Sequence, residues 1–374
     1  MRPDTEAALA EIIKAADGPL AIRGGGTRAL GAPLTGEVLE TTGLTGISLY
    51  EPGALTLVAA AGTPLAEVEA ALAEHGQRLP FEPMDHRGVL GTQGEPTVGG
   101  MAAANVSGPR RIQAGACRDY MLGVRFVDGA GRIVKNGGRV MKNVTGYDLV
   151  KLMAGSWGTL GVMTEVAFKV LPRPEAVATL ILEGLSEVDA VAAMARAQGS
   201  PYEITGAAHL PPMGDLPART CLRIEGFARS VAYRSGQLAE MFAGWPLRSE
   251  HDPEVCATLW RDIRDLRALQ DRPGDVWRIS CKPTDAPGIA VRLKAEVTLY
   301  DWGGGLIWAL MPAGLDARKM LGEFRGHATL VRGSAASRQL LPVFHPEPAP
   351  LARLTEGLRA RFDPRGLLNP GLMT

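Results

Sequence analysis

Thr97-Val98-Gly99-Gly100-Met101-Ala102-Ala103-Ala104-Asn105-Val106-Ser107-Gly108 carries no charged side chain and consists mainly of small residues. Small side chains let a large, flat group come close to the backbone. Glycine also admits backbone angles that point successive N–H groups the same way, which suits a phosphate or an electron-rich ring edge. A tight turn or close strand packing explains the same residues equally well. The surrounding sequence has to decide between a cofactor site and a structural turn.

Two further glycine clusters favour the cofactor site. Gly24–Gly26 follow a predicted strand at 20–23, and the segment 155–162 precedes a predicted strand at 165–171. The first cluster does not fit the G-x-G-x-x-G dinucleotide motif, because its glycines are contiguous and Pro33 interrupts any following helix. A plain glycine turn remains open for that cluster. One elongated ligand touched by all three loops is more economical than three unrelated turns.

The composition limits the class of protein. At 374 residues the chain is long enough for two domains. Equal numbers of acidic and basic residues, 40 of each, favour neither nucleic acid nor an anionic membrane surface as a partner. No run reaches the ~18 apolar residues of a membrane span, and the N-terminus lacks a signal-peptide pattern. We therefore expect a cytoplasmic protein that reaches a membrane only through partner subunits.

The cysteines predict neither a metal site nor an iron–sulfur cluster. No two of them show the short spacing that such sites need, and they read as reduced, mostly buried thiols. They are Cys117, Cys221, Cys256 and Cys281.

The glycine clusters and the motif between them resemble the FAD-binding domain of the vanillyl-alcohol oxidase flavoprotein family. The matching segments are Arg23–Thr27, Thr97–Gly100 with Asn105, Lys142–Leu149, and Gly155–Val162. Within the family the chain is most similar to the smaller FAD-binding subunits of bacterial glycolate oxidases. Ser107–Arg111 and the Arg118–Asp119 pair carry that similarity, together with the Lys142–Asp148 motif.

The resemblance implies an α+β fold. A PCMH-type FAD-binding domain of two α+β subdomains would span residues 1–172. An α+β cap domain with an antiparallel sheet would follow at 173–333, and a C-terminal segment, 334–374, would return to the FAD domain. Covalent members have a histidine directly after the first glycines, where this chain has Thr27, so the resemblance implies noncovalent FAD.

The resemblance also implies a set of cofactor-binding residues. The first glycine loop and Thr97–Gly100 would lie at the pyrophosphate, the backbone of 103–108 at the isoalloxazine, and the segment ending at Val162 would contribute main-chain contacts. The full set is Arg23, Gly24, Gly25, Gly26, Thr27, Arg28, Thr97, Val98, Gly99, Gly100, Ala103, Ala104, Asn105, Ser107, Gly108, Gly158, Gly161 and Val162.

Beyond Pro172-Arg173-Pro174 the pattern becomes regular. It predicts a helix from Ser186 to Gln198, an amphipathic helix over 254–271, and strands over 276–281 and 305–311. Most of the tryptophans fall here, and they either fill the core, which is the usual role of large aromatic side chains, or line a pocket over the flavin.

The tail predicts a helix ending near Phe362, followed by a segment that resembles the terminal D-P-x-G-x-L-N-P-G motif of the family's larger subunits. That motif would bring Asn369 near the flavin ring.

The catalytic residues stay unknown at this level. Hydroxy acid dehydrogenases of the family carry paired histidines that bind a metal and the substrate, and no such motif occurs here. Arg278, Lys282 and Asn369 are the candidates, with Arg278 chosen to hold a carboxylate, although structural or solvent-facing roles explain all of them equally well.

The resemblance implies a complex that oxidises a small 2-hydroxy acid, glycolate, with a larger FAD-linked subunit and an iron–sulfur subunit as partners. Two alternatives remain: a free-standing FAD dehydrogenase of another hydroxy acid or alcohol, and a flavin-containing structural subunit without turnover. We expect the isolated chain to bind FAD but to oxidise glycolate poorly, because no base and no carboxylate clamp are evident.

Overall fold

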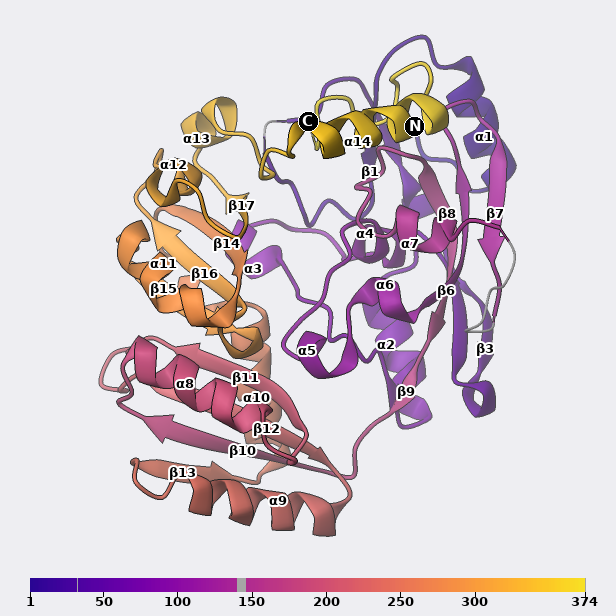
Figure 1. The fold of residues 1–374 in the computed structure, drawn as a ribbon. Helices are drawn as coiled ribbons and strands as arrows, with labels where there is room; N and C mark the ends of the chain where they lie inside the picture. Colours follow the sequence, from indigo (N-terminus) through magenta and orange to yellow (C-terminus); the bar gives the residue numbers. More distant parts are fainter. Residues whose placement is uncertain (32, 140–145, 374) are drawn as a thin grey trace.

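The computed structural model describes residues 1–374 except 32, 140–145 and 374. Two α+β units lie side by side, with the last helix crossing over the N-terminal one (Figure 1). The Lys142–Thr145 part of the family motif lies outside the described residues. Within the described ranges, no helix combines the length and apolar character needed to cross a membrane. All four cysteines are free thiols, and only Cys281 is not fully buried.

The N-terminal unit is built on a five-stranded antiparallel sheet. In sheet order its strands are β3 (Ile47–Glu51), β4 (Thr56–Ala60), β8 (Val162–Lys169), β6 (Met121–Val127) and β7 (Ile133–Gly137). A short antiparallel pair, β5 (Gln77–Arg78) and β9 (Leu171–Pro172), leads to the second unit.

Helices of this unit are short. They are α2 (Leu65–Glu74), α3 (Arg87–Leu90), α4 (Val98–Ala103), α5 (Arg111–Ala114), α6 (Cys117–Tyr120) and α7 (Leu149–Met153). The stretch that begins at Thr97 therefore opens as a helix. The Thr97 hydroxyl accepts the Gly100 N–H at 3.3 Å, as an N-cap does.

A small subdomain joins the two ends of the chain. It contains α1 (Glu6–Ala15) and the parallel strands β1 (Leu20–Arg23) and β2 (Glu37–Glu40). The C-terminal tail adds to β1: Leu20 N–H donates to the Leu367 carbonyl, and Asn369 N–H donates to the Leu20 carbonyl, at 2.7 and 3.0 Å. The tail thereby becomes part of the wall around β1.

The second unit, the cap, is an eight-stranded sheet whose paired strands are antiparallel. In sheet order the strands are β13 (Leu247–Glu250), β10 (Ala176–Glu183), β12 (Arg219–Gly226), β11 (Ile204–Leu210), β15 (Val297–Asp301), β16 (Leu306–Met311), β14 (Asp275–Cys281) and β17 (Gly326–Arg332).

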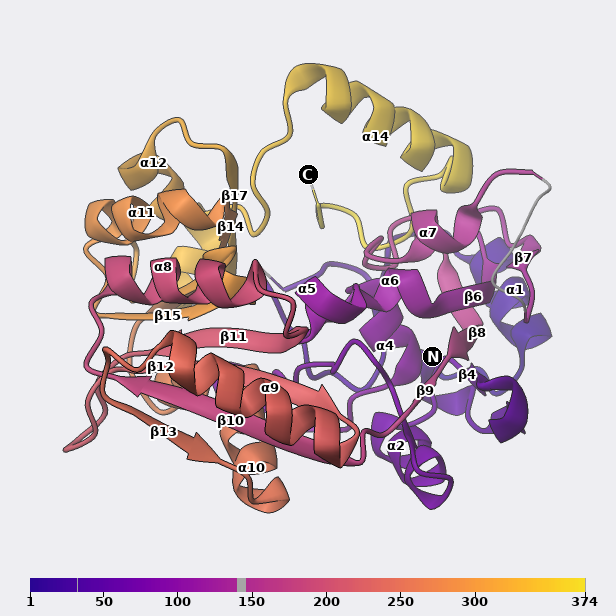
Figure 2. The same cartoon turned by 60° about the horizontal axis from the view of Figure 1, so that its bottom comes forward.

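Helices cover the outer face of this sheet (Figure 2). They are α8 (Glu187–Gln198), α9 (Ala228–Met241), α11 (Ala286–Leu293) and α12 (Ala317–Leu321), while α10 (Pro253–Arg264) packs on the inner face. The inner face shares one apolar core with the N-terminal unit, through residues such as Leu299 and Trp308. The predicted Ser186 cap of α8 is confirmed, because the Ser186 hydroxyl accepts the Asp189 N–H at 3.2 Å.

The helix predicted over 254–271 is wrong beyond Arg264. Leu266 has a left-handed φ of +58°, and the chain continues as a short 3-10 turn. Asp265 explains the break, since its carboxylate accepts the Asp85 N–H of the N-terminal unit at 2.9 Å. A contact between domains thus ends a helix that the local pattern would continue.

The C-terminal segment contains α13 (Ala335–Leu340) and α14 (Ala349–Phe362). The predicted tail helix is confirmed as α14. Its apolar stripe lies outward, with Leu351, Leu354 and Leu358 all exposed.

Candidate functional site

A cavity of about 380 Å³ lies in the N-terminal unit beside β1, the first glycine loop and the start of α4. Most of the cofactor-binding residues predicted from sequence line it. These are Arg23, Gly25, Gly26, Thr27, Arg28, Thr97, Gly99, Gly100, Ala103, Gly158 and Val162. The volume falls within the usual range for small-molecule sites.

The loops around the cavity pack directly against each other. A Cβ on Gly25 would lie 1.6 Å from the Glu95 carbonyl oxygen, and one on Gly24 would lie 2.6 Å from the Thr97 hydroxyl. Only glycine permits this approach. The glycines thereby bring the first loop against the start of α4, so that both loops border one cavity.

Two buried guanidinium groups face this cavity with nitrogens that lack a partner. Arg28 Nη2 and Arg338 Nε are buried and, within the described part of the chain, make no hydrogen bond. Burial lowers the pKa of Arg28 to about 10. Unsatisfied buried donors are costly, so a bound anion would relieve both. This donor set fits the phosphates of FAD.

Other predicted cofactor residues lie away from the cavity wall. They are Gly24, Val98, Ala104, Asn105, Ser107, Gly108 and Gly161. Asn105 Oδ1 accepts the Arg118 N–H at 2.9 Å, and Ser107 Oγ accepts the Cys117 N–H at 3.0 Å. The 105–108 segment therefore organises the start of α6, which precedes β6.

Asn369 lines the cavity, but its side chain is already engaged. Its Oδ1 accepts the Ile22 N–H at 2.7 Å, and its Nδ2 donates to the Trp157 carbonyl at 2.8 Å. Both ends of the amide thus clamp β1 to the third glycine loop. The structure gives Asn369 a structural role in shaping the cavity, rather than a polar group free for substrate.

Arg278 lies on the inner face of the cap sheet, with aromatic neighbours in place of a carboxylate. Its guanidinium carbon is 5.0 Å from the Trp302 ring centre and 6.0 Å from that of Trp308. Arg111 of the N-terminal unit approaches Trp302 as well, at 4.6 Å. We call Arg111, Arg278, Trp302 and Trp308 the arginine–tryptophan cluster. The two tryptophans are therefore both buried and part of a polar site.

The charges of this cluster are not neutralised. Among the described residues, neither Arg111 nor Arg278 forms an ion pair, and burial, reinforced by Arg111, lowers the pKa of Arg278 to about 10. Two nearby cations that form no ion pair with a carboxylate can serve as a site for an anion. Lys282, by contrast, is exposed just beyond the end of β14.

His86, which was not predicted as a site residue, lies between Arg28 of the cavity and Arg278 of the arginine–tryptophan cluster. Arg28 Nε contacts His86 Nδ1 at 3.3 Å. Burial, with Arg28 and Arg278 nearby, lowers the pKa of His86 to about 3, so its ring is neutral at ordinary pH. The series Arg28, His86 and Arg278 leads from the cavity to the cap.

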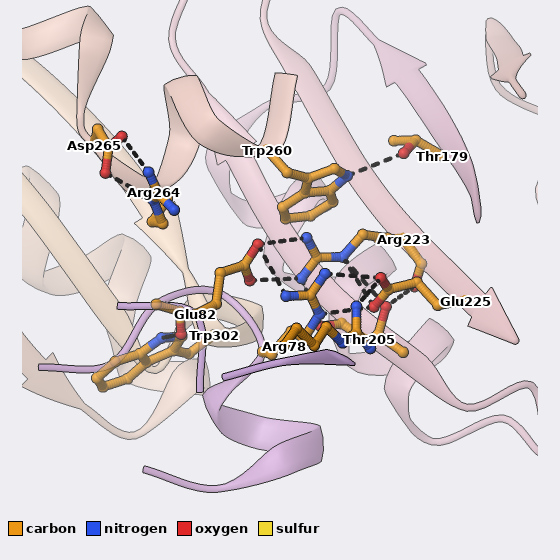
Figure 3. A network of polar contacts seen from close by, with 12 residues as sticks. Arg78, Glu82, Thr179, Thr205, Arg223, Glu225, Trp260, Arg264, Asp265 and Trp302 are labelled. Carbon is orange, nitrogen blue, oxygen red and sulfur yellow. Dashed lines mark hydrogen bonds and ion pairs between the residues drawn. The ribbon is translucent and has the colours of Figure 1, made fainter. Parts of the chain in front are cut away.

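A second set of charges joins the two units (Figure 3). We call Arg78, Glu82, Arg110, Arg223 and Glu225 the interdomain ion network. Arg223 donates to both oxygens of Glu82, at 3.0 and 2.9 Å, and Arg110 donates to both oxygens of Glu225, each at 2.8 Å. Burial alone would raise the pKa of Glu225, but Arg223 and Arg110 hold it well below its usual range. Every carboxylate in this network is paired across the interface.

Arg111, Arg338 and Asp301 were not predicted as site residues, whereas Trp302 belongs to the tryptophans expected either to fill the core or to line a pocket over the flavin. A signal exists for Asp301, since Trp302 and three glycines follow it directly at 302–305. The arginines carry no local signal, because only the fold brings them to the site.

Comparison with known proteins agrees with this geometry. The sequence profile of the family described as FAD binding domain matches residues 1–137. Glycolate oxidase subunit GlcE of Escherichia coli (strain K12) is 39% identical over 358 residues, which cover 95% of this chain and 92% of that protein. Glycolate oxidase subunit GlcD of Bacillus subtilis (strain 168) is 44% identical over 85 residues, 23% of this chain and 18% of that protein.

Among solved structures, an alkyldihydroxyacetonephosphate synthase superposes with a TM-score of 0.71 at 15% sequence identity, covering 99% of this chain and 75% of the other. At this identity the likeness concerns the fold alone. It extends over both units and the C-terminal segment.

Proposed function

The chain belongs to the family of FAD-binding oxidoreductase subunits that includes glycolate oxidase subunit GlcE, and from this we propose that it is the FAD subunit of a complex oxidising a small 2-hydroxy acid, glycolate, to the 2-oxo acid. The observation that carries the substrate class is the unpaired Arg278 on the inner face of the cap. A hydroxy acid brings the carboxylate that this guanidinium lacks.

FAD is held by the cavity of the N-terminal unit. Arg28 and Arg338 would bind its phosphates through their unpaired nitrogens. When bound, FAD supplies a two-electron acceptor. The buried Thr27 stands where covalent family members have a histidine, so we propose that FAD is bound noncovalently, and acid precipitation should release it.

The arginine–tryptophan cluster receives the substrate. Arg278 can donate two parallel hydrogen bonds to a carboxylate, and Trp302 and Trp308 wall the site with rigid apolar surface. Exclusion of water strengthens the ion pair.

These residues change the expectation for the isolated chain. The expectation that it oxidises glycolate poorly rests on the missing histidine pair. The fold, however, brings Arg111 and Arg278 together at Trp302, where they could hold a carboxylate. We propose that the FAD-loaded chain binds glycolate and accepts its electrons.

Electrons leave through partner subunits in this proposal. The dispersed cysteines leave the chain without the ligands of a cluster, so an iron–sulfur protein and a larger FAD-linked subunit would complete the path. The name of the GlcE relative as a subunit supports a multi-subunit assembly. Co-expression followed by gel filtration tests it: separate migration of this chain would contradict stable association.

Anaerobic mixing of the FAD-loaded chain with glycolate tests the function. We expect bleaching of the oxidised flavin spectrum by glycolate and none by acetate, which has the carboxylate without the hydroxyl. A chain that retains FAD but is not bleached by glycolate, alone or with its partners, would contradict the proposal.

A further inference from the structure

One buried carboxyl on the inner face of the cap has no part in the interdomain ion network. Asp301, at the end of β15, is 4% exposed. Within the described residues its side chain accepts one hydrogen bond, from the Trp302 N–H at 2.7 Å, and forms no ion pair. A buried carboxyl with so few partners needs an explanation.

The sheet register places Asp301 on the same face as Arg278. Arg278 pairs with Trp308, and Trp308 pairs with Leu299. Because directly paired residues share a face and side chains alternate along a strand, Asp301, two residues after Leu299, lies on that face too. The two residues lie two strands apart across the sheet and two residues apart along it, roughly 12 Å between their Cα atoms. A small acid bridging them would meet a long arginine on one side and a short aspartate on the other.

The turn after Asp301 holds it in place through an unusual backbone. Trp302 has a left-handed φ of +55°, which a non-glycine residue seldom adopts, and Gly303 and Gly304 follow at +67° and +96°. The Trp302 indole N–H donates to the Gly108 carbonyl of the N-terminal unit at 3.0 Å. Strain of this kind persists where the surroundings hold it, commonly at functional sites. The turn sets the carboxyl of Asp301 and the ring of Trp302 at the domain interface together.

The surroundings of Asp301 allow both its protonated and its ionised form near neutral pH. Burial raises its pKa to about 7, while the Trp302 N–H opposes that rise. Three charged groups face it: Glu82 from the N-terminal unit, which raises the pKa, and Arg223 from β12 and Arg278 from β14, which lower it. A group that titrates near neutrality is suited to taking up a proton during a reaction.

We propose that Asp301 is the general base that takes the hydroxyl proton of the 2-hydroxy acid held by Arg278. The inference rests on the proposed function. The hydroxyl O–H bond breaks and its proton goes to the Asp301 carboxylate. The α-carbon's C–H bond breaks and its hydrogen leaves with both electrons, for which bound FAD would supply the acceptor. The C–O single bond becomes the carbonyl of the 2-oxo acid, so that two electrons and two hydrogens are accounted for.

A purely structural role would make Asp301 no more than the N-cap of the turn at 302–304. Asparagine separates the two roles, because its Oδ1 still accepts the Trp302 N–H while its amide cannot take a proton. Asp301→Asn should therefore keep the fold, the FAD content and acetate binding within about threefold. Asp252→Asn is the matched control, since Asp252 caps α10 at an exposed position of the same domain.

The experiment is anaerobic stopped-flow reduction of the FAD-loaded chain by glycolate across pH 5.5 to 8.5. We expect Asp301→Asn to lower the reduction rate by about 100-fold or more, and Asp252→Asn to leave it unchanged. The wild-type rate should rise with pH through a midpoint near 7, because the base must be ionised, and the rise should vanish in Asp301→Asn.

A second readout does not depend on turnover. Infrared difference spectra of the FAD-loaded chain between pH 6 and 8 should show loss of one protonated carboxyl band that is absent in Asp301→Asn. If this band is missing from the wild type, or if Asp301→Asn is reduced at the wild-type rate, Asp301 is not the base. A wild-type chain that glycolate reduces neither alone nor with its partners overturns the proposed function itself, and that result is distinct from equal reduction of both chains.

Discussion

Two groups of arginines lie at the interface between the cap and the FAD-binding domain, and they differ in their partners. In the interdomain ion network, Arg110 and Arg223 each meet a buried carboxylate through two hydrogen bonds. In the arginine–tryptophan cluster, Arg111 and Arg278 meet indole rings. A guanidinium paired by its own protein is satisfied and fixes geometry, whereas one facing only aromatic rings keeps its hydrogen-bond donors for an incoming anion.

Removing a charge from the interdomain ion network should have the largest effect, a loss of stability that the arginine–tryptophan cluster would not show. Glu82→Gln leaves Arg223, whose side chain is 2% exposed, without its main counter-charge. Breaking a buried pair from one side typically lowers the free energy of unfolding by about 3–5 kcal/mol. Urea unfolding followed by tryptophan fluorescence measures it. Glu11→Gln, in an exposed pair with Lys14, is the control, and equal stability of the two variants would contradict a structural network.

Removing a charge from the cluster should act on binding instead of stability. Arg278→Met keeps the length of the side chain but loses both donors to the carboxylate. Charge-assisted bonds contribute about 1.5–3 kcal/mol each, so loss of both should lower the acetate and glycolate affinities of the FAD-loaded chain by about 100-fold or more. Stability should not fall, since an unpaired buried charge is removed.

Titration of the flavin spectrum with acetate measures this affinity. Arg325→Met, at an exposed position of the cap, should bind acetate as the wild type does. An unchanged affinity in Arg278→Met would place the carboxylate elsewhere.

Acid should weaken the network selectively. Burial opposes ionisation of Glu82, but Arg223 and Arg110 outweigh it and lower the pKa below its usual value of 4.5. A carboxyl with a lowered folded-state pKa stabilises the fold fully above the unfolded-state value and loses that contribution as pH falls through the folded-state value. Below pH 4.5 the wild type should therefore lose stability faster than Glu82→Gln, by at most about 1.4 kcal/mol per pH unit for this one group. Parallel losses in urea unfolding between pH 5 and 3 would contradict this.

The parts of the fold that could be predicted from sequence are those set by neighbouring residues. The strands β1, β14 and β16 and the Ser186 cap depend on local sequence pattern, flanking glycines and a side chain three residues away. The glycine loops were also found. The sequence could not distinguish a glycine that makes room for the cofactor from one that is needed for packing within the protein. Gly25 is of the second kind, because the Glu95 carbonyl lies against it.

The candidate site was only partly predictable, because contacts between distant segments create it. Arg278 was chosen for its place in a strand with tryptophan, yet its pairing with Trp308 and the approach of Arg111 depend on sheet register and domain docking. Asn369 was expected near the flavin ring and lines the cavity, but its two backbone partners come from segments far away in sequence. Helix α10 stops at Arg264 for the same kind of reason.

The smallest expected effect tests whether both arginines of the cluster serve the same anion. Arg111 is only half-buried at the start of α5, and its contact with the Trp302 ring is a cation–π interaction worth about 0.5–1 kcal/mol at such sites. Arg111→Met should therefore weaken acetate binding only several-fold, while Arg118→Met, an exposed neighbour that does not approach Trp302, should change nothing. Because both cations would share one carboxylate, the two arginine substitutions should be non-additive: Arg111→Met should have less effect in the Arg278→Met background than in the wild type. Full additivity in the spectral titration would mean that Arg111 acts on another group, and the cluster would then divide into a substrate arginine and a docking arginine.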